Sequence, residues 1–327
     1  MPKFPKLLNI HIMNGNSITC FGELIVDMIS TNAGTLVESE GFLKKFGGAP
    51  GNTAAGIAKL DLPVNIIAKV GNDPFGHYLK KTLDDVGVNT SHVIVSEKET
   101  TTLAFVALDK QGSRDFFFLR GAHEAVGSSE VDLPEGTTVF HFGSLTQTTE
   151  RNRRATDKLL SQAKKMDAII SYDPNLRESL WSDLEETKKI MLDTAKKVDI
   201  LKISQEEAYF LVGRGRVQDL AQEIFTKNLD ILFITLGPQG VYYKTEKYSG
   251  FVPTITVKVI DTTGAGDAFN AGQLSALFET GKRPSQLSKE ELEALIRRAN
   301  IIASLSTTKK GAISAFPEKS EIQKYIS

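Results

Sequence analysis

The residues with the clearest chemical potential form one short run near the C-terminal end of this 327-residue chain. Gly264, Ala265 and Gly266 lead into a predicted helix over residues 264–279, and Asp267 falls in its first turn. Glycines let successive backbone N–H groups converge, and a helix N-terminus adds the positive end of a dipole, so the run suits an anion. A carboxylate beside that anion suits phosphoryl transfer to an alcohol, because it can accept the hydroxyl proton. Asp267 could equally do no more than favour the start of the helix.

Other polar residues follow predicted strands, at the edge where open α/β sheets bind their ligands. They are Glu23 with Asp27, the run from Asp173 to Arg177, the run from Ser204 to Glu207, and the run from Thr235 through Gly237 to Gly240. The last run could offer N–H groups and a hydroxyl to a polyphosphate, or form a tight turn. Glu207 could support Mg²⁺ through water, or lie on a solvated helix face. Arg177 could hold a substrate oxygen, or join a surface ion pair.

A second glycine-rich run, from Gly47 through Gly48 to Asn52, opens another predicted helix with a proline near its first position. The two glycines permit a ligand to approach the backbone closely, and the Asn52 amide offers both donors and an acceptor. The alternative is an ordinary turn at the start of a helix. A single polar turn means little, but their recurrence at one predicted sheet edge indicates a shared site.

The elements that must position these residues alternate along the chain. Apolar, β-branched runs predict strands, and helical patterns lie between many of them. The predicted strands are residues 18–26, 64–70, 139–142, 168–172, 198–203, 231–236 and 257–260, and the predicted helices are residues 51–60, 75–86, 151–165, 184–197, 218–227 and 264–279. This alternation predicts a three-layer α/β/α fold with a mostly parallel sheet. Residues 31–45 and 96–119, with a turn predicted at 109–112, break the rhythm and predict a small additional sheet.

Composition excludes several classes of protein. Hydrophobic residues make up 41% of the chain and charged residues 24%, which is typical of a globular protein. Lys plus Arg number 39 and Asp plus Glu 40, so no basic excess exists to bind nucleic acid or an anionic membrane. No apolar run approaches the roughly 20 residues of a membrane span. The single Cys20 excludes an intrachain disulfide and favours the cytoplasm, and residues 1–17 are interpreted as a leader outside the fold.

The motifs make the chain similar to the ribokinase-like (PfkB) family of carbohydrate kinases. Two signatures carry the resemblance, in the right order and separation: residues 47–52 continuing to Gly71-Asn-Asp-Pro-Phe-Gly76, and Asp261-Thr-Thr-Gly-Ala-Gly-Asp267. The resemblance runs from about residue 18 to residue 317. It implies one kinase domain over residues 18–327, with a small β-sheet lid inserted at about residues 31–45 and 96–122. Such a lid often also forms a dimer, so a homodimer through the lid is expected.

The resemblance also implies a role for each candidate residue. Asp267 would be the general base that deprotonates a sugar hydroxyl, and the backbone amides of Gly264, Ala265 and Gly266 would form the anion hole. The sugar would contact Asp27, Gly47, Gly48, Asn52, Arg120, Asp173 and Arg177. The co-substrate ATP would contact Lys202, Thr235, Gly237, Gly240, Asn300 and Ala303. Glu207 would support Mg²⁺ through water, and Asp261 with Thr263 would lie near a monovalent cation such as K⁺.

Three features resemble the fructokinase branch of the family. They are Phe21-Gly-Glu-x-x-x-Asp27, the Ala-Pro within residues 47–52, and Asp173-Pro-Asn-x-Arg177. We therefore expect transfer of the γ-phosphoryl group of ATP to the C6 hydroxyl of fructose. Three positions depart from the pattern: His123 replaces an acidic residue, Ser204 replaces the Asn of a metal motif, and Ala315 replaces a Ser beside the cation site.

Other functions on the same fold stay open. Within the family, they are 2-keto-3-deoxygluconate kinase, ribokinase and aminoimidazole riboside kinase. From another class, the chain could be a non-catalytic protein that senses a sugar or a nucleotide. Such a protein would be expected to lose the base or the anion-hole glycines, and Asp267, Gly264 and Gly266 are all present.

Overall fold

The computed structural model describes residues 15–108 and 114–326. Within them the chain builds one nine-stranded sheet with the order β13-β12-β11-β10-β9-β8-β1-β4-β5. Neighbours from β5 to β11 pair in parallel, whereas β12 and β13 are antiparallel. The strands are β1 (Ser17–Phe21), β4 (Val64–Gly71), β5 (Val93–Ser96), β8 (Thr137–Gly143), β9 (Ile169–Asp173), β10 (Ile200–Ser204), β11 (Ile231–Thr235), β12 (Gly240–Lys244) and β13 (Ser249–Pro253). The predicted mostly parallel sheet is confirmed.

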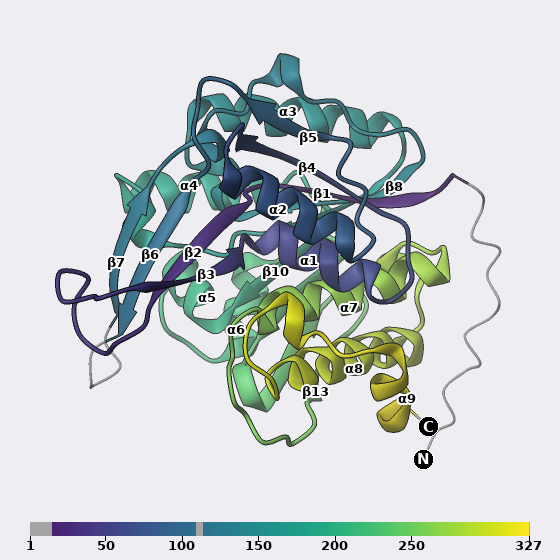
Figure 1. The fold of residues 1–327 in the computed structure, drawn as a ribbon. Coiled ribbons are helices and arrows are strands. Elements are labelled where there is room, and N and C mark those ends of the chain that lie inside the picture. Colours follow the sequence, from purple (N-terminus) through teal and green to yellow (C-terminus); the bar gives the residue numbers. More distant parts are fainter. Residues whose placement is uncertain (1–14, 109–113, 327) are drawn as a thin grey trace.

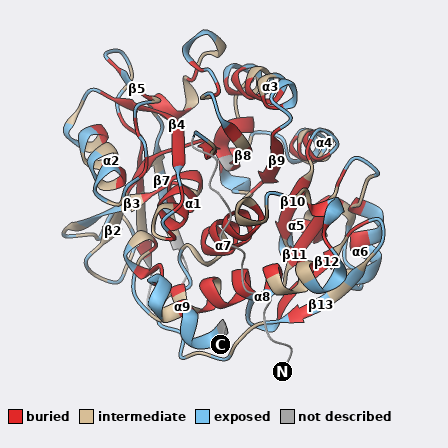
Figure 2. Cartoon of the chain, turned by 90° about the vertical axis from the view of Figure 1, so that its right-hand side faces the viewer, coloured by how far each residue is buried: buried red, intermediate tan, exposed pale blue. Residues whose placement is uncertain are grey.

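Helices cover both faces of this sheet, so the fold has three layers (Figures 1 and 2). One hydrophobic core joins the sheet to α1 (Ala49–Ala58), α2 (Pro74–Asp85), α7 (Ala265–Thr280), α8 (Lys289–Ser306) and α9 (Lys319–Ile326). The other core joins it to α3 (Glu150–Lys165), α4 (Leu184–Ala195), α5 (Gln205–Val212) and α6 (Val217–Ile224). Ile66 and Ile67 of β4 enter different cores, because successive side chains of a strand point to opposite faces.

A separate four-stranded sheet projects from one side of the molecule (Figure 1). Its order is β3-β2-β6-β7, with β2 (Ile25–Ser30), β3 (Phe42–Gly47), β6 (Leu103–Leu108) and β7 (Arg114–Leu119). The pairing of β6 with β7 is antiparallel, which confirms the predicted hairpin. The turn predicted at 109–112 lies outside the described residues. The limits of about 31–45 and 96–122 for a lid stay predictions.

Two strand predictions are wrong. Residues 18–26 are not one strand, because the chain leaves the large sheet after Phe21 and joins the small sheet as β2. Residues 257–260 form no strand; Ile260 donates its backbone N–H to the carbonyl of Thr307, just beyond α8, at 2.8 Å. The Val259 and Ile260 side chains are about half exposed, so their β-branched character reflects no buried strand. An apolar run by itself does not tell a core strand from an exposed extended segment.

The prediction of a leader over residues 1–17 falls largely outside the described residues, and Ser17 already belongs to β1. Across residues 15–108 and 114–326, no helix combines the length and apolarity needed to cross a membrane.

Candidate functional site

The candidate residues meet where the parallel strands end. β9 ends at Asp173, β10 at Ser204 and β11 at Thr235, and the ends of parallel neighbours share one edge of a sheet. The start of α7 lies against this edge, because Asn270 of α7 contacts Asp173 of β9, and the start of α1 joins it through the contact of Asn52 with Asp267 of α7. The shared edge therefore brings together residues more than 200 positions apart in the sequence.

Asp267 is buried and is held by a single side chain. Asn52 Nδ2 donates to Asp267 Oδ2 at 2.8 Å. Burial raises the pKa of Asp267 to about 7, and the charge of Asp173 adds to this rise, whereas the Asn52 hydrogen bond and Lys202 oppose it. A carboxyl group whose pKa lies near neutrality suits a general base.

A buried ion pair lies beside Asp267. Lys202 Nζ is 2.9 Å from Asp173 Oδ2, and both side chains are less than a tenth exposed. Asn270 Nδ2 donates to the same oxygen at 2.7 Å, and the backbone N–H of Asn175 donates to Asp173 Oδ1 at 3.1 Å. Burial alone would lower the pKa of Lys202, but the surrounding carboxylates, Asp173 first, raise it overall, so the ammonium group stays charged.

Asn270 was missed by the sequence analysis. It lies one helical turn after Asp267 on α7, so the same face of the helix presents both side chains. That spacing was the available signal, but an asparagine inside a helix carries no chemical meaning until its partner is known. The Oδ1 atoms of Asn52 and Asn270 are both buried and have no hydrogen-bond partner among the described residues.

The first residues of α7 form the predicted anion-binding segment. Gly264 precedes the helix with φ of 77°, a left-handed conformation that glycine adopts freely. A Cβ on Gly266 would lie 3.1 Å from Lys202 Nζ, so the buried ammonium group stands directly beside this backbone. Backbone N–H groups, a helix N-terminus and a cation therefore converge at one point.

The predicted sugar ligands gather around the β2–β3 pair and the end of β9. The Asp27 carboxylate covers the backbone of Gly47, because a Cβ there would lie 2.5 Å from Asp27 Oδ2. Gly48 has φ of 110° and approaches the Glu23 carbonyl so closely that a side chain would clash. Burial raises the pKa of Asp27 to about 6, and the Arg177 guanidinium opposes that rise. Because Arg177 also lowers the pKa of Asp267, its charge acts on both carboxylates.

The two arginines predicted near the sugar are exposed. Arg177 donates to the side chain and backbone of Asn175 at 2.8 and 3.3 Å, and to the Leu176 carbonyl. Arg120 follows β7, pairs with Glu124 at 2.7 Å and donates to the Leu180 carbonyl at 3.3 Å. Both guanidinium groups keep further N–H donors for a ligand.

The predicted nucleotide residues occupy two places. Thr235, Gly237 and Gly240 form the connection between β11 and β12, and the Thr235 hydroxyl donates weakly to the Ile203 carbonyl at 3.4 Å. Asn300 of α8 is buried, and its Nδ2 donates to the carbonyls of Val252 and Pro253. Its side chain thus fastens α8 to β13, and the half-buried Ala303 lies one turn further along α8.

The predicted cation residues are held by backbone amides. Glu207 Oε1 accepts from Leu176 N at 2.6 Å and Oε2 from Ser204 N at 2.7 Å, so Glu207 and Ser204 form a capping box at the start of α5. Each oxygen keeps a lone pair that a metal-bound water can use. Asp261 accepts from Thr263 N and Gly311 N, both at 2.9 Å, which brings the segment containing Ala315 to the same place. No set of three or more metal-binding side chains occurs in the described part of the chain.

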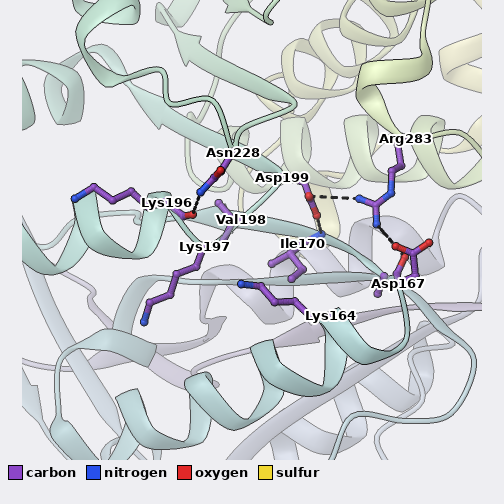
Figure 3. A pocket seen from close by; sticks show the side chains of 10 residues that line it. Lys164, Asp167, Ile170, Lys196, Lys197, Val198, Asp199, Asn228 and Arg283 are labelled. Carbon is purple, nitrogen blue, oxygen red and sulfur yellow. Dashed lines mark hydrogen bonds and ion pairs between the residues drawn. The ribbon is translucent and has the colours of Figure 1, made fainter.

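A pocket of about 220 Å³ lies away from the candidate site, at the opposite edge of the sheet, where β9 and β10 begin (Figure 3). Arg283 crosses it, pairing with Asp167 at 2.6 Å and with Asp199 at 3.3 Å. It contains none of the predicted site residues.

Comparison with known proteins places these observations in a family. The model of the pfkB family carbohydrate kinases matches residues 16–319. A probable fructokinase-2 of Arabidopsis thaliana is 38% identical over 325 residues and covers 96% of each chain. The crystal structure of a fructokinase from Xylella fastidiosa with bound ATP superposes with a TM-score of 0.86 at 29% identity, over 95% of this chain and 98% of that one. A fructokinase double mutant from Vibrio cholerae, with fructose, ADP and potassium bound, gives 0.85 at 28% identity, over 96% and 99%. The predicted ribokinase-like fold is confirmed.

Proposed function

Because this chain belongs to the pfkB family of carbohydrate kinases, we propose that it is an ATP-dependent fructokinase that phosphorylates the C6 hydroxyl of fructose. The observation that carries the proposal is the buried Asp267 carboxylate, held by Asn52 beside the anion-binding start of α7. A buried base next to a preformed anion site is what phosphoryl transfer to an alcohol needs. The similarity of the chain to fructokinases, one of them solved with fructose bound, supports fructose as the acceptor.

The residues divide the reaction between them. Asp267 takes the proton of the sugar hydroxyl, and the oxygen of that hydroxyl attacks the γ-phosphorus of ATP while the bond to the β-phosphate oxygen breaks. The backbone N–H groups of Gly264 and Gly266 and the Lys202 ammonium group hold the phosphoryl oxygens. The Ala265 N–H donates to the Thr262 carbonyl at 3.2 Å and has to exchange this bond to join them. Asp173 holds the Lys202 side chain and is itself held by Asn270, which makes Asp173 a supporting group more than a sugar ligand. Asp27, Asn52 and Arg177 hold the sugar.

The proposed reaction also involves two cations, Mg²⁺ with ATP and a monovalent ion such as K⁺. Mg²⁺ bound to ATP neutralises phosphate charge, and Glu207 would hold it through water, since Mg²⁺ keeps several waters and needs few protein ligands. A monovalent cation such as K⁺ would lie by Asp261 and Thr263, where two segments converge. The potassium ion in the Vibrio cholerae relative supports this second site.

We also propose a homodimer formed through the small sheet. Its edge strands β3 and β7 expose Leu43, Phe116, Phe117 and Leu119, each by more than two fifths. Exposed apolar side chains on edge strands favour association, and a twofold dimer is the commonest result. Light scattering tests it: a dimeric mass that becomes monomeric in Phe117→Asp supports the proposal, and a monomeric unaltered protein contradicts it. A cytoplasmic location stays a prediction, which cell fractionation tests.

The substrate is tested by measuring ATP turnover against a panel of sugars. Fructose, 2-keto-3-deoxygluconate, ribose and aminoimidazole riboside separate the functions open within the family. We expect the largest kcat/KM with fructose, and a fructose 6-phosphate product. Turnover with another member of the panel but not with fructose would contradict the substrate, whereas ATP binding without any turnover would favour the non-catalytic sensor.

A further inference from the structure

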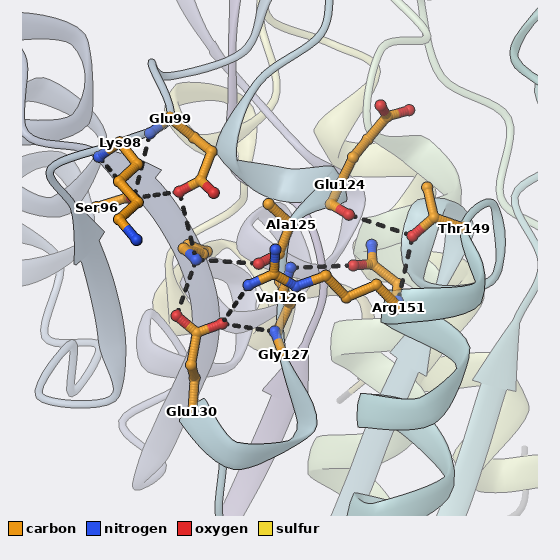
Figure 4. Close-up of polar contacts among 12 residues, drawn as sticks. Ser96, Lys98, Glu99, Glu124, Ala125, Val126, Gly127, Glu130, Thr149 and Arg151 are labelled. Carbon is orange, nitrogen blue, oxygen red and sulfur yellow. Dashed lines mark hydrogen bonds and ion pairs between the residues drawn. The ribbon is translucent and has the colours of Figure 1, made fainter.

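A second cluster of charged side chains, which includes Glu99, Glu130 and Arg151, surrounds one buried lysine (Figure 4). Its centre is Lys69 of β4, whose side chain is only 4% exposed. Lys69 Nζ donates to the Ala125 carbonyl at 3.0 Å and to Glu130 Oε1 at 2.8 Å, and lies 3.4 Å from Glu99 Oε2. An ammonium group has three N–H donors, so each has a partner here.

Two of these partners, Glu99 and Ala125, belong to the two segments that join the β6–β7 hairpin to the body. The first leg, residues 99–102, leads into β6 and begins with Glu99. The second leg, residues 120–125, leaves β7 and ends with Ala125. Glu130 follows shortly after the second leg, and it also accepts from Gly127 N at 2.6 Å and pairs with Arg151 at 3.2 Å. Lys69 therefore connects both legs to one strand of the large sheet.

The legs are also bound to each other. Ala122 N donates to the Thr100 carbonyl at 2.8 Å, and the Thr102 hydroxyl is 2.5 Å from His123 Nδ1. His123, which stands where the fructokinase pattern has an acidic residue, is buried in this contact. A displacement of one leg must therefore displace the other.

The second leg begins with Arg120, which is predicted to contact the sugar. The Arg120 guanidinium reaches back to Glu124 on the same leg at 2.7 Å. The Glu124 carbonyl accepts from the Thr149 hydroxyl at 3.2 Å, and the His123 carbonyl from Asn152 Nδ2 at 2.8 Å, so α3 fixes the outer side of the leg. On the inner side, Lys69 supplies the link to β4.

We propose that Lys69 is a positioning residue, which holds both legs of the β6–β7 hairpin on β4 and so sets where Arg120 stands relative to the sugar. This inference rests on the proposed function, because it assigns Lys69 to the sugar side of that site. Without the ammonium group, Glu99 and Glu130 would repel each other across the space between the legs, and the Ala125 carbonyl would lose its donor. The leg carrying Arg120 would then take up a range of positions.

The direct test replaces Lys69 by Met and measures both substrates. We expect the KM for fructose to rise about tenfold while the KM for ATP changes less than about twofold, since small displacements of a binding group cost much affinity. Equal changes in both KM values, or none, would overturn the proposal, because a merely structural role does not single out the sugar.

Milder variants guard against a protein that fails to fold. Glu99→Gln and Glu130→Gln each remove one partner of Lys69, and both side chains are at least a quarter exposed, so folding should survive. Each should raise the fructose KM by about threefold, which is less than Lys69→Met because two of the three links made by Lys69 remain. Asp132→Asn is the matched control. Asp132 lies two residues after Glu130 and pairs with Lys158 at 2.8 Å, but it does not contact Lys69. This variant should leave both KM values unchanged; a rise equal to that of Glu130→Gln would overturn the proposal.

Hydrogen exchange separates this inference from the proposed function. In the protein without substrates, Lys69→Met should speed exchange of the amides of β6 and β7 and leave those of β9 and β10 unchanged. Unchanged exchange in the hairpin would overturn the link even if the enzyme is a fructokinase. Conversely, faster exchange there in a protein with no sugar turnover would support the link and reject the proposed function.

Discussion

Charged side chains gather at both ends of the parallel strands in the large sheet. The first edge is where β9 and β10 end, the second edge is where they begin, and the charges have different partners at each. Where β9 and β10 end, Lys202 pairs with Asp173 at 2.9 Å, and Asp173 is its one hydrogen-bond acceptor among the described residues. Where the same strands begin, Arg283 bridges Asp167 and Asp199, and Asp199 also accepts from Ile170 N at 2.7 Å. The Lys202 ammonium group is buried, so water cannot readily take its remaining N–H donors, whereas the Lys196 and Lys197 side chains at the second edge are about half exposed.

This difference distinguishes a site from a structural cluster. At the first edge, buried carboxylates crowd around one buried ammonium group, and two asparagine oxygens lack partners. Burial without full pairing is costly and persists where a ligand completes the arrangement. At the second edge, Lys196 and Lys197 pair with Asp193 and Asp157, and lie near the end of α4, where cations favour the helix dipole.

The largest predicted effect comes from removing the base. Asp267→Asn should lower kcat by about 10³- to 10⁴-fold, because an amide cannot accept the hydroxyl proton. The thermal midpoint should not fall, since a buried carboxyl with a raised pKa gives way to a neutral isostere. Steady-state kinetics, calorimetric ATP titration and a melting curve check this. Unchanged turnover would mean that Asp267 is not the base.

The second-largest effect on kcat is expected from removing the buried ammonium group of Lys202. Lys202→Met should lower kcat by about 10²-fold, because a preorganised charge beside the phosphoryl oxygens is lost. The ATP KM should rise as well, whereas the fructose KM should change little. The matched control is Arg298→Met, which removes another largely buried cation, paired with Glu279 near the far end of α7. Arg298→Met should lower the thermal stability but leave kcat unchanged. If it lowered kcat as much as Lys202→Met does, the loss at Lys202 could not be assigned to a charge acting on the substrate.

The pH dependence of kcat/KM tests the carboxyl group of Asp267 at the first edge. The pKa of Asp267 is raised from 3.8 to about 7, so the folded protein still holds this proton at mildly acidic pH, and the base form grows as pH rises through 7. We expect kcat/KM for fructose to fall about tenfold per pH unit below neutrality. A profile that stays flat down to pH 5 would contradict the raised pKa.

The smallest effect is expected at the opposite edge. Arg283→Met breaks the bridge to Asp167 and Asp199, and partly exposed ion pairs contribute little, so the thermal midpoint should drop by about 2–4 °C. The kinetic constants should stay within about twofold, because none of the predicted site residues lies in that pocket. A large change in kcat would show that the two edges communicate.

The sequence pointed to candidate residues that the structure brings together at one edge of the sheet, but not to the contacts between them. The glycine-rich runs and Asp267 were accessible because glycine and carboxylate chemistry is local. The contacts of Asp173 were not, because Lys202 was expected to contact ATP and Asn270 looks like any other asparagine within a helix. Residues 18–26 and 257–260 were misassigned because an apolar run does not say which sheet, if any, it joins.

The sequence by itself determined the family and the alternation of strands and helices, and it singled out Asp267 as the candidate base, since each follows from short-range pattern. Only the tertiary structure decided which charges remain without full pairing. Asn52 and Asp267 come from helices 215 positions apart, and Lys69 joins two legs that frame a hairpin. Contacts of that kind depend on how the strands order themselves in a sheet, and a periodic pattern along one chain carries no information about its neighbours in space.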